Sequence, residues 1–402
     1  MEDRIYDYWV ATLQDGYIGN IIEMTDAAGG AKSLYSLFSR QKMGDDIDGI
    51  INEIKDRNRR SFFTDKMKEH IAKRWKNEAT LEKEYYQMIN DNISYVNHTD
   101  KDFPEKLKNI SSIPYGLFVK GKLPDIDRKS VAIVGARECS EYGRLCAEYF
   151  GDRLSRRGVQ IISGMAWGID GISQMAAIKA GGKSFGILGC GVDVIYPKKN
   201  RDLYYMLCEN GNGLISEYSP KSDAISRMFP PRNRLISAFC DVLLVVEARA
   251  RSGTLITVSM ATEQGKSIMA VPGRITDELS IGCLGLIKDG AIPAISVDSV
   301  MNELDTVREE YHQLELNPDY TNIIYSEVMP AEGDNKLKVL ELIGSEKEVF
   351  GCLNLDPIGA EEIAIKTKLD ISDVLITLSR LDLKGLLKET APGEFVKASR
   401  FT

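Results

Sequence analysis

The stretch Ser130-Val-Ala-Ile-Val-Gly135-Ala-Arg137 decides the fold. It is an apolar run that ends at a glycine and precedes a helix pattern, as expected for a strand covered on both faces. The same unit recurs along the chain, in the runs Val131–Gly135, Val159–Ser163, Ser184–Gly189, Gly213–Tyr218, Asp241–Ala248 and Lys266–Gly273. Such alternation of strands and helices predicts an α/β fold with an extended Rossmann-like, doubly wound and mostly parallel sheet. Ligands of these sheets bind at the carboxyl ends of the strands.

The chain before this sheet is predicted to be helical. Apolar residues recur at helical spacing from residue 1 to about 95, so we expect a small helical domain of the SAM-like or helix-hairpin type (1–95). Its segment 53–76 mixes Lys and Arg with aromatic residues, which favours the solvated face of an ordinary helix over a nucleic-acid contact. Residues 93–121 predict an additional strand, helix and strand that extend the main sheet, and the Rossmann-like domain is assigned to 96–305.

The chain after the sheet is predicted to contain a linker and a further small domain. Residues 306–335 are polar, aperiodic and rich in turn formers, which predicts a linker. Residues 336–402 match a winged-helix pattern of three helices and a hairpin. The helices are expected at 337–343, 361–366 and 371–381, and the strands at 385–388 and 394–397. Aspartates surround the third helix, whereas a DNA-reading helix meets phosphates with Lys and Arg, so an auxiliary or protein-contact role is favoured.

The composition bounds the class of protein and its partners. The chain has 402 residues, 43% of them hydrophobic and 27% charged, as in a soluble protein of several domains. No apolar run approaches the roughly 20 residues of a membrane-spanning helix, and the N-terminus lacks a signal-peptide pattern. The seven cysteines form no C-x-x-C pair, which indicates reduced thiols and a cytoplasmic location. With a net charge of −8, a nucleic-acid partner must be held by a local basic patch.

Residues that attract anions follow several of the predicted strands. Gly135-Ala-Arg137 offers a glycine turn, a helix start and a guanidinium, which together favour a phosphate. A structural salt bridge of Arg137 is an equal alternative. Glycines and a serine between Ser163 and Gly171 form a loop whose amides can cradle phosphate oxygens, and Asp170 is expected to cap the following helix.

Three further loops carry similar chemistry. Tyr196 precedes Lys198 and Lys199, and cations beside a ring are the usual pairing for single strands, although a solvated turn is an alternative. In Phe229-Pro-Pro-Arg-Asn-Arg234 the arginines diverge, so one is expected to face the cleft and the other to pack against the sheet. Ser252-Gly-Thr254 offers hydroxyls and free N–H groups at a helix start. The predicted DNA- and phosphate-binding residues are Gly135, Arg137, Ser163, Gly164, Gly168, Lys198, Lys199, Arg232, Asn233, Arg234, Ser252, Gly253 and Thr254.

Common nucleotide, metal and catalytic sites are not supported by the sequence. Gly182-Lys-Ser184 and Gly265-Lys-Ser267 imitate the end of a Walker A loop but lead from a helix into a strand, the reverse of the required order. The histidines lie outside the predicted sheet, and no Cys/His, Ser/His or metal-ligand spacing occurs. We therefore expect no cofactor and no catalytic residue, and structural roles for Glu247 and Asp193. Several weak anion sites along one sheet edge suit a polymer better than a small cofactor.

These motifs resemble those of the DNA-processing protein A (DprA, or Smf) family. The resemblance covers about 100–300 and rests on Val131–Arg137, Ser163–Asp170, Gly189–Pro197, Phe229–Ile236, Val246–Thr257 and Val271–Gly273. It implies a protein that binds single-stranded DNA, forms a homodimer through its Rossmann-like domain and loads a RecA-type recombinase during natural transformation, without enzymatic turnover. It also implies DNA contacts at Arg137, at Lys198 or Lys199, and at the turn Arg232–Arg234.

The chain departs from that family at two positions, and two other functions stay open. Gln174 stands where the family usually has histidine, and Leu284 stands near its dimer edge where asparagine is usual. A nucleotide-binding or nucleotide N-glycosidase enzyme of the same superfamily is one alternative, although its Gly-Gly-x-Gly-Thr loop and catalytic glutamate are not intact here. A transcription regulator that acts through the C-terminal wing is the other.

Overall fold

The computed structural model describes most of the chain, namely residues 3–15, 21–42, 65–316, 345–352, 358–367, 369–383, 387–391 and 394–397. Contacts divide the chain into two compact units, Met1–Gln313 and Leu314–Thr402. The N-terminal helices therefore belong to the same unit as the sheet, and residue 95 does not mark a break between units. Within the described ranges, no helix combines the length and the apolar character that a bilayer crossing requires.

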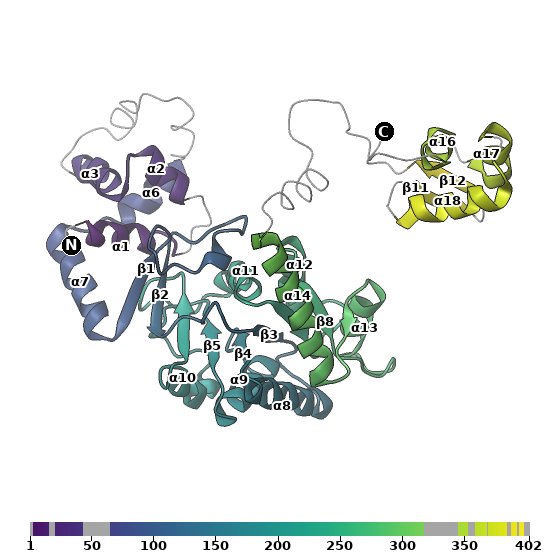
Figure 1. Ribbon diagram of the computed structural model, residues 1–402. Coiled ribbons are helices and arrows are strands. Elements are labelled where there is room, and N and C mark those ends of the chain that lie inside the picture. Colours follow the sequence, from purple (N-terminus) through teal and green to yellow (C-terminus); the bar gives the residue numbers. More distant parts are fainter. Residues whose placement is uncertain are drawn as a thin grey trace. The chain divides into compact units, whose positions relative to one another are not determined.

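A nine-stranded sheet forms the centre of the first unit (Figure 1). Its order is β1-β2-β6-β5-β4-β3-β7-β8-β9; the neighbours from β6 to β9 are parallel, and β1 and β2 are antiparallel additions. The strands are β1 (Ile93–Asn97), β2 (Gly116–Gly121), β3 (Ser130–Val134), β4 (Gln160–Ser163), β5 (Ser184–Ile187), β6 (Gly213–Ser216), β7 (Val242–Val245), β8 (Ser267–Ala270) and β9 (Ile292–Pro293). The predicted mostly parallel Rossmann-like sheet, with its extension before Ser130, is confirmed.

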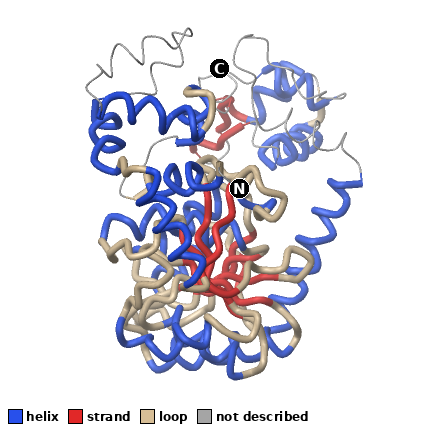
Figure 2. Tube along the Cα trace, turned by 90° about the vertical axis from the view of Figure 1, so that its left-hand side faces the viewer, coloured by secondary structure: helices blue, strands red, loops and turns tan. Residues whose placement is uncertain are grey.

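Helices cover both faces of the sheet, because alternate residues of a strand point to opposite sides. Val131 and Ile133 of β3 pack in one core with α8, α9 and α14, whereas Ala132 and Val134 pack in another with α11, α12 and α13. Figure 2 shows the strands of this unit enclosed between helices. The helices are η1 (Glu105–Leu107), α8 (Glu141–Arg156), α9 (Ile169–Lys179), η2 (Lys198–Asn200), α10 (Arg201–Leu207), η3 (Ser226–Met228), α11 (Phe229–Phe239), α12 (Gly253–Glu263), α13 (Ile281–Lys288) and α14 (Val297–Leu316).

The N-terminal helices share their core with the antiparallel edge of the sheet. Trp9 is fully buried in one cluster with Phe118 of β2. The Gln14 side-chain amide donates hydrogen bonds to the carbonyl oxygens of Gly116 and Glu217 at 3.3 and 3.0 Å. These contacts attach the helices to the sheet and explain why the predicted 1–95 segment is not a unit of its own. The helices are α1 (Arg4–Thr12), α2 (Ile21–Ala27), α3 (Ala31–Lys42), α6 (Asp65–Arg74) and α7 (Glu78–Asn90).

The basic and aromatic segment 53–76 is described only from residue 65 onward; its part 53–64 lies outside the described residues. In α6 the apolar side chains of Met67 and Ile71 are buried at i, i+4 spacing. This part is therefore an amphipathic helix that packs on its neighbours, as the sequence favoured.

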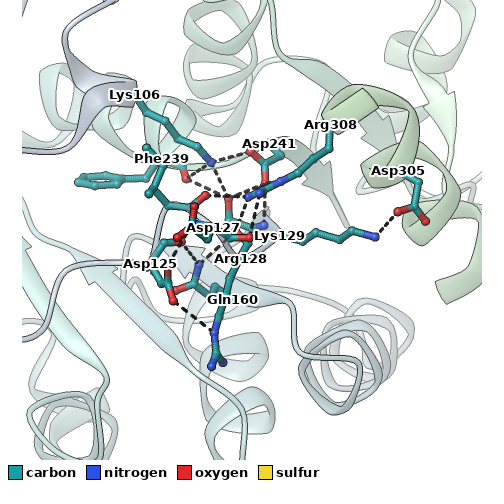
Figure 3. A network of polar contacts seen from close by, with 12 residues as sticks. Lys106, Asp125, Asp127, Arg128, Lys129, Gln160, Phe239, Asp241, Asp305 and Arg308 are labelled. Atoms are coloured by element: carbon teal, nitrogen blue, oxygen red, sulfur yellow. Dashed lines mark hydrogen bonds and ion pairs between the residues drawn. The ribbon is translucent and has the colours of Figure 1, made fainter. Parts of the chain in front are cut away.

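Asp241, just before β7, joins the amino ends of the central strands (Figure 3). Its carboxylate accepts hydrogen bonds from the Ser130 N–H at 2.8 Å and from Lys106 Nζ at 2.5 Å, and the Arg308 guanidinium lies 3.1 Å away. Burial alone would raise the pKa of Asp241, but the two cations outweigh burial and hold the pKa below its usual range. This stabilisation is therefore present above the ordinary carboxyl pKa and is lost as the pH falls through the folded-state value.

Helix α14 extends into the segment that was predicted to be a linker from residue 306. It runs from Val297 to Leu316, with Val300 and Leu304 fully buried against the sheet at helical spacing. Arg308 continues this attachment, because its guanidinium donates hydrogen bonds to carbonyl oxygens of the turn before β3. Thr306 and Glu309, two of the polar residues that suggested a linker, are exposed on this helix. Residues 317–335 lie outside the described residues.

The second unit has winged-helix architecture. Its small core joins Val349, Ile363 and Leu378, one from each helix. The elements are α16 (Ser345–Cys352), β10 (Ile358–Gly359), α17 (Ala360–Thr367), α18 (Ile371–Leu383), β11 (Leu387–Ala391) and β12 (Glu394–Lys397), and the sheet order is β10-β12-β11. The predicted second and third helices and the hairpin are found, whereas the helix expected at 337–343 lies outside the described residues.

Replacing Asp241 by Ala is expected to lower the free energy of unfolding by about 2–4 kcal/mol, because Lys106 and Arg308 lose the carboxylate that balances their charge. The cost is below that of a fully buried pair, since the side chains of these cations stay 21% and 27% exposed. Urea unfolding followed by circular dichroism measures the change. Asp298→Ala, which removes an exposed carboxylate paired with Arg157 in the first turn of α14, is the control. An equal loss in both variants would contradict the role given to Asp241.

Candidate functional site

A cleft opens where the strand order of the sheet switches direction. Strands β3 and β7 are parallel neighbours, but the chain continues from β3 to β4 on one side and from β7 to β8 on the other. Such a switch leaves a crevice at the carboxyl ends of the two strands. The cleft here has a volume of about 620 Å³. The predicted site residues that line it are Gly135, Arg137, Arg232, Asn233, Ser252, Gly253 and Thr254.

Arg137 follows β3 and is exposed at the cleft. Its guanidinium forms no ion pair with any residue that the structure describes. The structural salt bridge that the sequence left open for Arg137 is therefore not found in these ranges. The backbone beside it is fixed by Gly168, whose φ is +89° and where a Cβ would lie 2.3 Å from the Arg137 carbonyl oxygen. Only glycine fits this close approach. Gly168 thus contributes to the site through geometry and does not line the cleft.

The start of α12 faces the same cleft from the β7 side. Ser252 is the N-cap residue, with φ −144° and ψ 156°, but its side chain makes no capping hydrogen bond. Its Oγ is buried without a hydrogen-bond partner among the described residues. The first backbone N–H groups of a helix have no partner within the helix and lie at the positive end of its dipole. An unpaired hydroxyl and free amides at one point form an anion site.

Arg232 lies under the floor of the cleft, where it holds a neighbouring loop. Its guanidinium is almost fully buried and donates hydrogen bonds to the carbonyl oxygens of Gly164, at 3.0 Å, and of Ile187. Asp170 accepts a hydrogen bond from the Gly164 N–H at 3.1 Å. Burial raises the pKa of Asp170, and the Arg232 cation opposes this rise. The expected capping role of Asp170 is wrong, since Gly168 is the N-cap of α9 and Asp170 ties the preceding loop instead.

Arg234 and Ser163 do not line the cleft. Arg234 forms an ion pair with Glu217 at 2.6 Å, and its Nε donates to the Ser112 carbonyl oxygen at 2.9 Å. Ser163 is fully buried, and its hydroxyl donates to the Ile133 carbonyl oxygen at 2.6 Å. One arginine of the Phe229–Arg234 turn was expected to face the cleft. That arginine is Arg232, which is buried and lines the cleft, whereas Arg234 does not.

An aromatic surface, formed by Trp167 and Tyr196, adjoins the cleft. Their side chains are 47% and 41% exposed, and together with Phe229 they line a smaller cavity of about 110 Å³ that also borders Arg137. The centroids of the Tyr196 and Phe229 rings lie 5.3 Å apart. Exposed rings of this kind offer stacking surfaces to planar groups. Sequence reasoning identified Tyr196 but missed Trp167 and Phe229, although a tryptophan between two glycines of a loop was an available signal.

Lys199 packs against the aromatic surface, with its Nζ 4.8 Å from the centroid of the Trp167 ring. Lys198 beside it is exposed. Asn200, the next residue, is buried and donates hydrogen bonds from Nδ2 to the carbonyl oxygens of Met165 and Ala166, both at 3.0 Å. The η2 turn therefore fixes the loop that carries Trp167 and places a cation over its ring.

Other polar residues of this edge have structural partners. Glu247 accepts hydrogen bonds from the N–H and the hydroxyl of Ser140, and Asp193 accepts one from the Lys221 N–H at 2.7 Å, so both acids have structural partners. Gln174 accepts from the Met165 N–H at 3.1 Å and donates to β5. This glutamine, one of the two departures noted in the sequence, is therefore hydrogen-bonded through both its oxygen and its nitrogen inside the protein. No group of His, Cys, Asp and Glu suited to a metal ion occurs among the described residues.

These features define a Rossmann-like α/β protein with an anion-attracting cleft at the switch point of its sheet, joined to a winged-helix unit. The family model described as DNA recombination-mediator protein A matches residues 94–305, and that of the DprA winged helix domain matches residues 339–393. The chain belongs to the DNA recombination-mediator protein A (DprA/Smf) family. The resemblance inferred from the sequence motifs is confirmed.

Individual relatives agree with this assignment. The chain is 39% identical over 228 residues to DNA processing protein DprA of Streptococcus pneumoniae, which covers 57% of this chain and 78% of that protein. It is 34% identical over 298 residues to Protein Smf of Escherichia coli, covering 74% and 75%. The X-ray structure of DprA from Streptococcus pneumoniae aligns with a TM-score of 0.58 and 31% identity, and covers 75% of this chain and 98% of that one.

Replacing Gly168 by Ala is expected to lower the free energy of unfolding by about 1–3 kcal/mol, because the new Cβ meets two carbonyl oxygens in a left-handed backbone conformation. Thermal unfolding followed by circular dichroism measures this. Gly253→Ala is the matched control, since no heavy atom lies within 4 Å of its Cβ position. A Gly168→Ala protein as stable as the control would show that the two loops are not held in this close approach.

Proposed function

We propose that this chain binds single-stranded DNA in the cleft between β3 and β7 and acts as a recombination mediator. One observation carries the proposal: at a single sheet edge, anion donors that have no carboxylate partner among the described residues adjoin exposed aromatic rings. Arg137 and the start of α12 supply the donors, and Trp167 with Tyr196 supplies the rings. Proteins that bind single strands combine these two features, with cations for the backbone and rings for the bases.

A flexible polymer suits this edge better than a compact cofactor. The anion donors and the rings extend through two adjoining cavities, of about 620 and 110 Å³. A duplex hides the faces of its bases, so rings such as Trp167 can stack only on unpaired bases. The net charge of −8 means that binding depends on these local cations and not on a general attraction. Strong dependence on salt is therefore expected.

The family description supports a hand-over of the bound strand to another protein. A recombination mediator transfers single-stranded DNA to a recombinase, and we propose a RecA-type recombinase as that partner, during DNA uptake and natural transformation. Seven free cysteines support a cytoplasmic, reducing location for this activity. We also propose that the chain acts without enzymatic turnover. Release of free base from a nucleoside monophosphate by the purified protein would favour the N-glycosidase alternative instead.

We propose that the chain forms a homodimer through the β9 edge of the sheet. Among the strands that the structure describes, β9 pairs with β8 alone, and Ile281, Ile292 and Ile295 near this edge are exposed. An unpaired edge beside exposed apolar residues is a common docking surface for a second copy. Leu284, the departure from the family pattern in this region, lies in α13 and is partly buried.

The winged-helix unit is proposed to contact protein and not to read DNA sequence. The exposed residues of α18 include Ile371, Leu375 and Ile376, and Asp373 is exposed as well. A helix that enters a DNA groove meets phosphates with Lys and Arg, and a surface of these apolar and acidic residues with a single described cation, Arg380, is poorly suited to that contact.

Arg137→Ala and Lys199→Ala are expected to weaken binding to oligo-dT about tenfold each, the loss of one charge-assisted contact. The slope of log affinity against log salt should become shallower by about 0.7 for each lost phosphate contact. Fluorescence anisotropy titrations at several salt concentrations measure both quantities. Lys179→Ala, an exposed cation on α9 away from the cleft, is the control. Unchanged affinity and slope in both cleft variants would remove the cleft from consideration.

Deleting residues 335–402 is expected to leave the affinity for oligo-dT within about threefold of the full chain, because the cleft lies wholly in the first unit. The same titration with a duplex of equal length supplies the comparison. If the full chain bound the duplex more tightly than the single strand, and the deletion abolished binding, a regulator acting through the wing would replace the present proposal.

A further inference from the structure

The surface of α10 presents a second pairing of a cation with an exposed ring. The Arg201 guanidinium lies 5.7 Å from the centroid of the Tyr205 ring, one helical turn away. Tyr205 is 47% exposed, whereas the adjacent Tyr204 is buried and donates a hydrogen bond to the Val192 carbonyl oxygen at 2.9 Å. Tyr204 and its buried neighbours anchor the helix, and the exposed Tyr205 ring packs edge-on against the Tyr204 ring, with the centroids 5.5 Å apart.

This pair continues the aromatic surface of the cleft along the chain. Arg201 directly follows Asn200, whose side chain holds the loop of Trp167 in place. The residue before, Lys199, lies over the Trp167 ring. Two cation–ring pairs, Lys199 with Trp167 and Arg201 with Tyr205, are therefore joined by the short step of the chain from η2 into α10. The spacing of Arg201 and Tyr205, one turn of an α-helix, is about 5.4–6 Å along the axis.

We propose that Arg201 and Tyr205 form an additional subsite, on which a single strand that leaves the cleft stacks a further base and pairs a further phosphate. The inference rests on the proposed function and deepens it, since it assigns a footprint longer than the cleft. A ring in this position can take any base, because every base has a flat aromatic face. The arginine can shift from the ring to a phosphate oxygen without losing a buried partner, since both side chains are at the surface.

If this subsite binds DNA, the affinity lost when it is removed depends on the length of the bound strand. Oligo-dT of about six nucleotides occupies the cleft alone, whereas oligo-dT of about 20 nucleotides also reaches α10. In the full-length protein, Tyr205→Ala should weaken binding of the long oligonucleotide about tenfold and leave binding of the short one unchanged. Tyr205→Phe, which keeps the ring, should bind both as the unaltered protein does.

Two further variants make the test specific. Arg201→Gln should make the salt dependence shallower for the long oligonucleotide only, because it removes a phosphate contact outside the cleft. Tyr149→Ala removes an equally exposed ring, 46% accessible, from α8, and should change neither affinity. Thermal unfolding of each variant verifies that the fold is kept.

The outcomes separate this inference from the proposed function. Equal affinity of Tyr205→Ala and the unaltered protein for the long oligonucleotide would overturn the subsite while the cleft stands. The same loss on short and long strands, or an equal loss in Tyr149→Ala, would also overturn it. Failure of the unaltered protein to bind either strand would overturn the proposed function together with the subsite.

Discussion

The switch in strand order between β3 and β7 is the constraint on which the rest of the structure depends. The two strands are hydrogen-bonded neighbours, yet the chain leaves them toward opposite sides of the sheet. No crossover can then cover their carboxyl ends, and a cleft remains there. At the amino ends, Asp241 binds the Ser130 N–H and two cations, and thereby fixes the same pair of strands. The strand order produces the cleft, and the residues of the surrounding loops determine which ligands it can bind.

Buried polar groups hold those loops and leave the surface donors available. Arg232 supplies hydrogen bonds to the glycine loop after β4 and to the end of β5, while Asn200 of η2 and Gln174 of α9 bind the same loop. Buried polar atoms are costly unless paired, so these cross-links are mutually satisfied inside the protein. Arg137 at the surface therefore needs no part in holding the loop. Buried Arg232 thus holds the loops of this sheet edge in place, and exposed Arg137 keeps its charge available to a ligand.

The sheet and the position of the cleft could be predicted because continuous apolar strands and their glycine-ended loops are local features of the sequence. The separate fates of Arg232 and Arg234 could not, because each depends on partners distant in the chain, such as Gly164 and Glu217. The attachment of the N-terminal helices and of α14 to the sheet depends on distant contacts in the same way. The polar composition from residue 306 onward suggested a linker, whereas the buried residues that attach this helix to the sheet, Val300 and Leu304, come before it.

A crystal structure of the protein with a short oligo-dT tests the central claim most directly, because it locates the strand without reference to affinity. The account predicts phosphate oxygens within hydrogen-bond distance of Arg137 and of the first N–H groups of α12, with at least one base against the Trp167 or Tyr196 ring. A strand bound on another face, with the cleft between β3 and β7 empty or occupied by a small metabolite, would contradict it.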